Sequence, residues 1–190
     1  MKTLAELTAY ARRRGDANPL LYSSPGNGTV PHIMGELFNA VAKLKITHIP
    51  YKGGGPALSD VLAGHVKVIF APAASSLQYI QSGKLKALAV SGQKRLSSLP
   101  DVPTMAEAGV AGYAVDGWYG MLMAARTPTP IIKRFAISLH RALQANDVKQ
   151  RLASQGIDTA VSTPEALRKI IVSELAQWAK VVREAGIQPE

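Results

Sequence analysis

Three short segments of small residues, 24–29, 51–57 and 71–76, contain the backbone and hydroxyl groups best suited to hold a small anion. Glycines in the first two segments let backbone N–H groups approach a ligand closely. Each segment also leads into a predicted helix, whose amino end favours negative charge. These features together predict a cradle for a carboxylate or another small anion, made largely of backbone.

A few side chains add to these backbone groups. Ser24 and Thr29 offer hydroxyls, and Lys52 brings a cation beside the triple glycine, where we expect it to attract an acid. The candidate ligand-binding residues are, in chain order, Ser24, Gly26, Asn27, Gly28, Thr29, Tyr51, Lys52, Gly53, Gly54, Gly55, Pro56, Ala57, Ala71 and Ser75.

Plainer interpretations exist for each of these residues. Glycines after a strand often serve only a tight turn. Lys52 can equally be a solvated loop residue, and Tyr22 and Tyr51 can pack beneath the loops. Residues 27–29 also match a glycosylation acceptor, a short pattern that occurs by chance. Two glycine segments in consecutive units of one sheet nevertheless favour a binding role.

Patterns typical of catalysis and of nucleotide binding are missing. The triple glycine lacks the Gly-Lys-Ser/Thr ending of a phosphate-binding loop, and neither glycine segment has the spacing G-x-G-x-x-G. The motif G-x-S-x-G does not occur either. The four histidines are His32, His48, His65 and His140. They are far apart in the sequence, and their spacing differs from that of metal ligands, so we interpret them as ordinary core or surface residues. We therefore expect no catalytic residues, no metal and no cofactor.

Alternating strands and helices should position the three segments. Because strands and helices alternate, we expect an α/β fold with mainly parallel sheets flanked by helices. Ligands bind such sheets at the carboxyl ends of the strands, where the three segments fall. A helix is expected to begin near Leu4 and end at Gly15, and another to begin at Pro31. The remaining expected elements here are strands at 20–23, 46–49, 66–70 and 85–90, and helices at 56–63 and 73–81.

Beyond Pro100 the pattern changes. We expect a short helix at 104–108, a strand at 118–123, and helices at 130–144, 148–155 and 164–185. The last helix has a clear start at Ser162 or Thr163 and carries Trp178 within an apolar stripe. The stripe favours packing against the core over a partner groove or a membrane face.

The composition limits the classes of partner. The formal charge of +9, from 22 Lys plus Arg against 13 Asp plus Glu, favours anionic partners. The basic residues are scattered, and the run 12–14 lacks interleaved aromatic residues, so we expect no nucleic acid. With zero cysteines, disulfides are excluded. We find no signal peptide at residues 1–7 and no segment near the roughly 20 apolar residues of a membrane span.

Six segments of the chain share the order of one known family. They are 22–29, 49–57, 83–90, 99–104, 107–109 and 178–183. On these residues the chain resembles the TctC or Bug family, the periplasmic solute receptors of tripartite tricarboxylate transporters.

The resemblance implies a fold like that of type II periplasmic binding proteins, a two-lobed Venus flytrap. It implies a receptor and not an enzyme. The implied ligand is a small carboxylate, such as a di- or tricarboxylate, an acidic amino acid or an aromatic acid. Segments 24–29 and 51–57 would form one wall of the cleft, and closure would present the receptor to membrane permease subunits. The implied location is the periplasm.

The resemblance also implies that the chain lacks the N-terminal part of the family. We then expect residues 1–18 to be a helix leading from the first lobe. Residues 19–115 would be a nearly complete second lobe, the ligand-binding α/β domain, and residues 116–190 the C-terminal part of a partial first lobe. An incomplete lobe exposes sheet edges and apolar faces, which predicts self-association.

Alternative functions stay open at the level of sequence. One is a flytrap-type ligand-sensing regulatory domain, and another is a truncated fragment that binds nothing. A third is an enzyme on the same fold, which would need an acid and a base close to Gly28 and Gly54. The sequence leaves the identity of the carboxylate open, because backbone amides recognise the charge that all carboxylates share.

Overall fold

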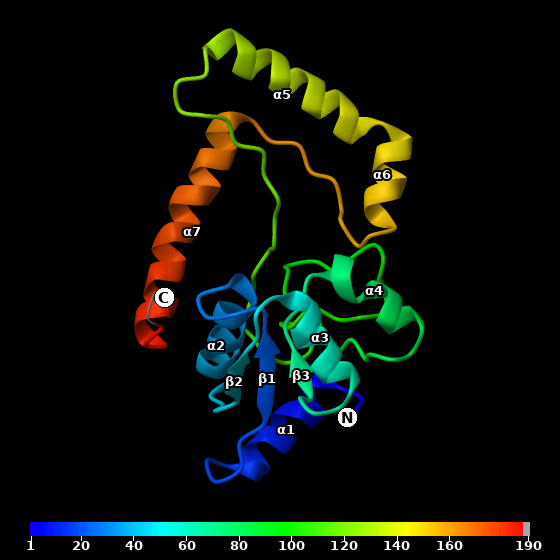
Figure 1. Ribbon diagram of the computed structural model, residues 1–190, viewed down its shortest axis with the longest axis vertical. Helices are drawn as coiled ribbons and strands as arrows, with labels where there is room; N and C mark the ends of the chain where they lie inside the picture. Colours follow the sequence, from blue (N-terminus) through cyan, green and yellow to red (C-terminus); the bar gives the residue numbers. More distant parts are fainter. Residues whose placement is uncertain (188–190) are drawn as a thin grey trace.

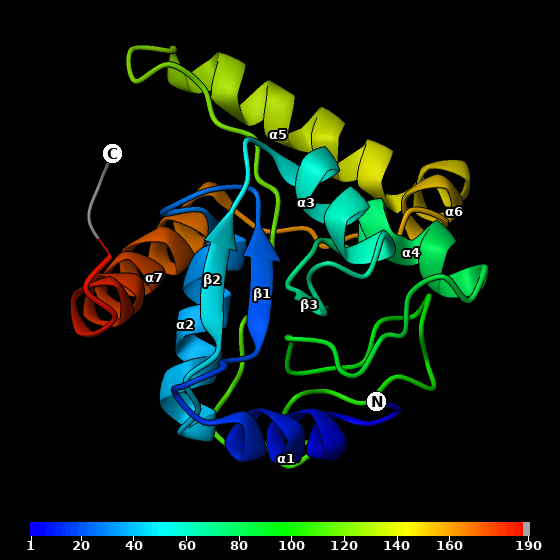
Figure 2. The same ribbon diagram turned by 60° about the horizontal axis from the view of Figure 1, so that its bottom comes forward.

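Three short parallel strands form the sheet that organises the N-terminal half of the chain. In the computed structural model, which describes residues 1–187, β1 (Leu21–Ser24) lies between β2 (Thr47–Pro50) and β3 (Val68–Ile69). The register places Tyr22 beside both His48 and Val68. Because the strands are parallel, the loops that follow them leave the same edge of the sheet (Figures 1 and 2).

Helices connect the strands as the sequence predicts. α2 (Val30–Ala42) contacts β1 and β2, and α3 (Gly54–Leu62) contacts β1 and β3. α4 (Ala73–Gln81) follows β3 with the predicted bounds. α1 (Leu4–Arg14) begins at an N-cap whose hydroxyl accepts the backbone N–H of Glu6. The predicted strand and helix units are therefore confirmed to within a few residues at each end.

Aromatic side chains dominate the core beneath the sheet. Tyr22, Phe38 and Tyr113 are almost fully buried. The Tyr22 and Phe70 rings meet edge to face with centroids 5.6 Å apart, and Phe38 and Tyr113 do so at 6.4 Å. These contacts join β1, α2, the end of β3 and the loop at 113 into one packed unit. The core thus lies directly under the strand that precedes the first glycine loop.

Two elements predicted between residues 85 and 108 do not form. The expected strand at 85–90 is reduced to one bridge between Val90 and Thr104. The expected helix at 104–108 is a turn, in which Thr104 Oγ1 accepts from Glu107 N at 3.1 Å and Glu107 Oε2 accepts from Thr104 N at 2.8 Å. This reciprocal pairing is a capping box, so the helix start signal is real but the chain leaves helical geometry after one turn.

The segment 118–123, predicted to be a strand, is extended chain without a strand partner among residues 1–187. Tyr119 and Leu122 each expose 75% of their surface, and Met121 exposes 60%. Trp118 Nε1 donates to Glu174 Oε2 at 2.9 Å, which ties the segment to the last helix. The strand prediction is wrong for this structure because no neighbouring strand supplies the ladder hydrogen bonds.

The C-terminal third consists of helices with little packing. α5 (Thr129–Gln144) lies at the end of the molecule opposite α1, followed by α6 (Asn146–Ala153) and α7 (Pro164–Glu184) (Figure 1). No residue described from 116 to 187 is buried. Trp178 of α7 does pack against the core, as predicted, but Ile170 and Leu175 of the same stripe are exposed. Core packing is therefore confirmed for only part of the predicted stripe.

The predicted division at residues 18 and 115 stays a proposal. The core cluster supports only the boundary at 115, because its buried residues end at Val115 but include Leu4 and Leu7 of α1.

Gly35 of α2 is expected to be intolerant of any side chain. A Cβ there would overlap the ring of Tyr22, whereas a Cβ at Gly55 in α3 meets nothing within 4 Å. Alanine favours a helix over glycine by about 1 kcal/mol, but overpacking costs about 1–3 kcal/mol. Urea unfolding should therefore show Gly35→Ala lowering the free energy of unfolding, with Gly55→Ala neutral or stabilising. Equal stability of the two variants would contradict the close approach of α2 to β1.

Candidate functional site

Backbone hydrogen bonds hold the first two glycine loops side by side. Tyr51 N donates to Ser24 O at 3.0 Å, and Gly53 N donates to Pro25 O at 2.9 Å. These bonds continue the pairing of β1 with β2 beyond the ends of both strands. The segments 24–29 and 51–57, separated in the sequence, therefore form one continuous surface at the carboxyl edge of the sheet.

The loop 24–29 is shaped by glycine geometry and by local hydrogen bonds. Gly26 and Gly28 have φ of 150° and 68°, a region that side-chain-bearing residues rarely adopt. Thr29 Oγ1 donates to Gly26 O at 2.7 Å, and Gly26 N donates to Ser24 Oγ at 3.2 Å. Asn27 and Gly28 are exposed at the tip of the loop. The loop thus presents backbone and the Asn27 side chain to solvent.

The loop 51–57 ends in the amino terminus of α3. Gly53 has φ of 115°, and among the described residues no side chain caps the helix. Gly54, Gly55 and Pro56 are exposed, and so is Lys52. This helix end has free backbone donors and a nearby cation, which suits an anionic group.

Tyr51 is anchored from below by α3. Its hydroxyl donates to the Asp60 carboxylate, which also contacts His65 Nδ1 at 2.8 Å. The hydrogen bond from Tyr51, and then the one from His65, hold the pKa of Asp60 below its ordinary value. The same bond raises the pKa of Tyr51. Tyr51 is half-buried, so its ring supports the loop. Of the two roles considered for Tyr51, ligand contact and packing beneath the loop, this position favours packing.

The third predicted segment, 71–76, lies at the same edge of the sheet. The hydrogen bonds of Ser75 stay within this segment. Ala71 is half-buried and Ser75 is exposed at the start of α4. Ser75 N and Ser75 Oγ both donate to Pro72 O, at 3.1 and 2.9 Å. These contacts are local, so Ala71 and Ser75 adjoin the first two loops only through the neighbouring strands β1 and β3.

Two of the predicted ligand residues lie under the surface. Ser24 and Ala57 have no exposed surface. Ser24 Oγ contacts His48 Nε2 at 2.6 Å, and Ala57 O accepts from Ser23 Oγ at 3.3 Å. In this conformation the two residues shape the loops from beneath, while their exposed neighbours face solvent.

The structure brings together two histidines that lie far apart in the sequence. The rings of His32, on the first turn of α2, and His48, in β2, stack with centroids 3.8 Å apart and planes 12° from parallel. Gly28 N donates to His32 Nδ1 at 3.1 Å. His32 is buried and His48 is half-buried, and the sequence does not predict their contact with the loop 24–29.

Glu36 and Tyr22 complete this polar cluster. Tyr22 lies under His48 with ring centroids 5.0 Å apart, and its hydroxyl donates to Glu36 Oε1 at 2.7 Å. Burial, followed by this hydrogen bond, raises the pKa of Tyr22. The cluster could have been found from the parallel register, which sets Tyr22 beside His48, and from the position of His32 on the first turn of α2.

The environment of the two histidines disfavours their charged forms. Burial, and then the charge of His32, lowers the pKa of His48 to about 4. Burial also lowers the pKa of His32, against an opposing contribution from the Glu36 carboxylate. Both rings are therefore neutral at neutral pH.

A pocket of about 380 Å³ opens beside the histidine pair. It is lined by Asn27, His32, Glu36, His48 and the segment 185–187 after α7. It therefore joins the tip of the first loop to the polar cluster beneath it.

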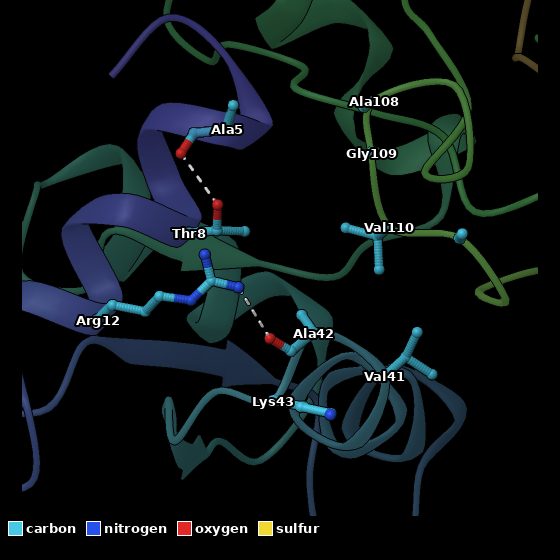
Figure 3. A pocket seen from close by; sticks show the side chains of 10 residues that line it. Ala5, Thr8, Arg12, Val41, Ala42, Lys43, Ala108, Gly109 and Val110 are labelled. Carbon is cyan, nitrogen blue, oxygen red and sulfur yellow. Dashed lines mark hydrogen bonds between the residues drawn. The ribbon is translucent and has the colours of Figure 1, made fainter.

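Another pocket, of about 430 Å³, lies between α1, the end of α2 and the loop 108–111 (Figure 3). Arg12 and Lys43 are among its lining residues, and the Arg12 guanidinium donates to Ala42 O at 3.2 Å. α1, which supplies Ala5, Thr8 and Arg12 to this pocket, lies at the amino-end edge of the sheet, away from the glycine loops (Figure 2).

Residues 1–187 contain neither a cluster of metal ligands nor a membrane-spanning helix. No group of three or more His, Cys, Asp or Glu side chains is placed to hold a metal ion. Nor does any helix of this described part combine the length and the apolar character of a membrane span.

Comparison with known proteins decides the family. The model of the tripartite tricarboxylate transporter family receptor, TctC, matches residues 1–187. The chain belongs to the TctC receptor family. Receptors of this kind are a class without enzymatic activity.

Two curated relatives of this TctC chain are longer than the chain itself. It is 36% identical over 172 residues to a UPF0065 protein from the tcbD-tcbE intergenic region of Pseudomonas sp., covering 90% of this chain and 51% of that protein. It is 36% identical over 159 residues to BugT of Bordetella pertussis, covering 84% of this chain and 49% of BugT. The chain thus spans about half the length of each of these two relatives.

Solved structures of TctC-like proteins share the fold. A structure of an R. palustris protein with adipate superposes with a TM-score of 0.90 at 31% identity, covering 100% of this chain and 63% of that one. The periplasmic binding protein BugD gives 0.85 at 31%, covering 100% and 64%. MatC from Rhodopseudomonas palustris with bound malate gives 0.80 at 31%, covering 95% and 62%. The α/β fold of the type II periplasmic-binding-protein kind is confirmed.

Mild acid is expected to destabilise the TctC chain through the histidine pair. The folded-state pKa of His48, about 4, lies below the ordinary value of 6.5, so the unfolded chain takes up the proton first. Stability from this pair is fully present above about pH 6.5 and is lost as the pH falls toward about 4. Urea unfolding at steps of pH should show the free energy of unfolding falling across this window.

The double variant His32→Asn with His48→Gln should flatten this fall, and His140→Gln, in α5 and outside the contacts of the pair, should leave it unchanged. The carboxylates of Asp60 and Glu107 act at lower pH, because their ordinary pKa values are 3.8 and 4.5. An unchanged slope in the double variant would contradict the neutral pair.

Proposed function

We propose that this chain binds a small dicarboxylate at the loops 24–29 and 51–57, as a receptor of a tripartite tricarboxylate transporter. The observation that carries the proposal is the union of the two glycine loops by the hydrogen bonds Tyr51 N to Ser24 O and Gly53 N to Pro25 O. They bring the exposed tip of one loop beside the uncapped amino end of α3.

The chemistry of this surface favours a carboxylate. The N–H groups at the start of α3 point along the helix axis toward solvent, where the helix dipole is positive. Lys52 is exposed beside them, and the whole chain has a net charge of +9. Related structures contain adipate and malate, both dicarboxylates, which makes the same class the first choice for this chain.

A binding role fits the surrounding ionisable groups better than a catalytic one. His32 accepts from Gly28 N, and His48 contacts Ser24 Oγ, so both rings are engaged with the loop itself. Near the second loop, Asp60 is engaged with Tyr51 and His65. These groups are thus occupied in shaping the loops, leaving no described acid and base pair free to face a ligand together.

We further propose a periplasmic location and contact with membrane permease subunits. The support is membership of the transporter receptor family and the likeness to BugD, described as a periplasmic binding protein. In a flytrap receptor, closure around the ligand supplies the signal that a permease reads.

We also propose that the chain self-associates. Tyr119, Met121 and Leu122 expose most of their surface in one short segment, and Val172 and Leu175 expose 60% and 65% of theirs on α7. Clustered apolar surface of this kind is typical of protein contacts. The exposed backbone of 118–123 can also pair with a strand of a second copy.

The binding proposal is tested by thermal shift and calorimetry with adipate and malate, each against its dimethyl ester. A ligand that binds only the folded state raises the melting temperature, by an amount that grows with ligand concentration. We expect a shift for at least one free acid and none for its ester. Absence of a shift with both acids would overturn the proposal and favour a fragment that does not bind.

Gly55→Asp is expected to abolish acid binding without unfolding the chain. A side chain fits there, since a Cβ meets nothing within 4 Å, and an acid near the start of α3 stabilises the helix. It would place a negative charge where the ligand carboxylate is proposed, so affinity should fall about tenfold or more. The matched control Gly55→Asn should stay within about threefold of the wild type. Equal losses in both variants would contradict a charge-based site.

Self-association is tested by sedimentation velocity over a range of concentrations. We expect a mass above 20.2 kDa that rises with concentration. The double variant Tyr119→Lys with Leu122→Lys should shift the protein toward monomer, and Ala63→Lys, at an exposed position after α3, should not. A monomer mass at every concentration would contradict the proposal.

A further inference from the structure

We propose that His32 and His48 are positioning residues for the loop 24–29, and that only their neutral, stacked form holds this loop in its ligand-binding shape. The inference rests on the proposed ligand function, because it concerns how the same site is kept in order. Neither histidine is among the residues that the sequence predicts for the ligand.

The contact with Gly28 fixes the state of His32. A backbone N–H can only donate, so His32 Nδ1, 3.1 Å from Gly28 N, must be the acceptor. A protonated ring carries hydrogens on both nitrogens and has no acceptor left. Protonation of His32 therefore breaks the bond that ties the tip of the loop to α2.

The contact with Ser24 ties the base of the loop to β2. Ser24 Oγ lies 2.6 Å from His48 Nε2, accepts from Gly26 N at 3.2 Å, and lies 3.0 Å from Gly26 O. A hydroxyl has one hydrogen and two lone pairs, so His48 completes its set of partners. The same Gly26 O accepts from Thr29 Oγ1, so this chain of bonds reaches the start of α2.

The stacking geometry couples the two rings. With centroids 3.8 Å apart and nearly parallel planes, two positive charges would repel strongly. Among residues 1–187, the ionisable groups facing the rings are Tyr22 from β1 and Glu36 from α2. The segment 185–187, which follows α7 and lines the same pocket, has no ionisable side chains. Glu36 attracts a proton to His32, but burial has the larger effect.

Acid should therefore release the loop before it unfolds the chain. Loop order and proton binding are linked. The ordered loop lowers the affinity of the histidines for protons, and protonation lowers the equilibrium constant for ordering the loop by the same factor. Ligand affinity is reduced by the fraction of chains that keep the binding-competent loop. The window runs downward from about 6.5, the ordinary pKa of histidine, toward about 4 for His48.

The variants are chosen to separate hydrogen bonding from titration. His32→Asn can place an amide oxygen where Nδ1 accepts from Gly28, and His48→Gln can place an amide near Ser24; neither side chain titrates. His32→Ala and His48→Ala remove the partners altogether. His140→Gln is the matched control, because His140 is a half-buried residue of α5 that bonds to Ser162 O at 2.8 Å, outside the proposed site.

Calorimetry with adipate and malate is the first readout. At about pH 7.5, each alanine variant should lose about tenfold in affinity, and the Asn/Gln double variant should stay within about threefold. On lowering the pH, wild-type and His140→Gln affinity should fall together, faster than that of the double variant. The ligand's own protonation is common to all, so it cancels in the ratio. Parallel pH profiles for wild type and double variant would overturn the inference.

The backbone amide of Gly28 is the second readout, and it needs no ligand. In ¹H–¹⁵N spectra of the wild type, its resonance should move with the same apparent pKa as the ring signals of His32 or His48. A Gly28 resonance that does not follow either ring would overturn the inference. If the wild type binds neither acid, the proposed function fails, and this titration still decides whether the histidines hold the loop.

Discussion

The pairing of β1 with β2 is the constraint on which the site depends. Its register places Ser24 opposite Pro50, so the next amides, of Tyr51 and Gly53, reach the carbonyls of Ser24 and Pro25. A shift by one residue would also separate Tyr22 from His48 and turn alternate side chains to the other face. The joined loops, the histidine stack and the Tyr22–Glu36 bond all follow from this one alignment.

Much of the fold could be predicted because local signals and tertiary packing agree in the first eighty residues. Proline and glycine mark the starts of α2 and α3, and Phe38 of the apolar stripe of α2 is buried in the core. The failures lie where an element needs a distant partner. Residues 118–123 have a strand composition but no strand beside them, so composition alone could not decide their structure.

The backbone of the candidate site could be predicted from the sequence. The side chains that hold the loops in place could be predicted less well. Glycines 26, 28 and 53 adopt positive φ, which suits the tight turns that glycines after a strand often serve. The histidine stack depends on how α2 crosses back over β2, and a single sequence does not show which side chains that crossing brings together. Ser24 illustrates the difference: its hydroxyl suggested a ligand contact, but in the fold it faces His48.

The central claim is that backbone amides of two joined loops hold a dicarboxylate. The most direct measurement is a ¹H–¹⁵N titration of the labelled chain with adipate and with malate. The account predicts saturable shifts concentrated at the amides of Gly26, Gly28, Gly54 and Gly55. Saturable shifts centred on Arg12 and Lys43 at the opposite edge of the sheet, or no saturable shift with either acid, would contradict it.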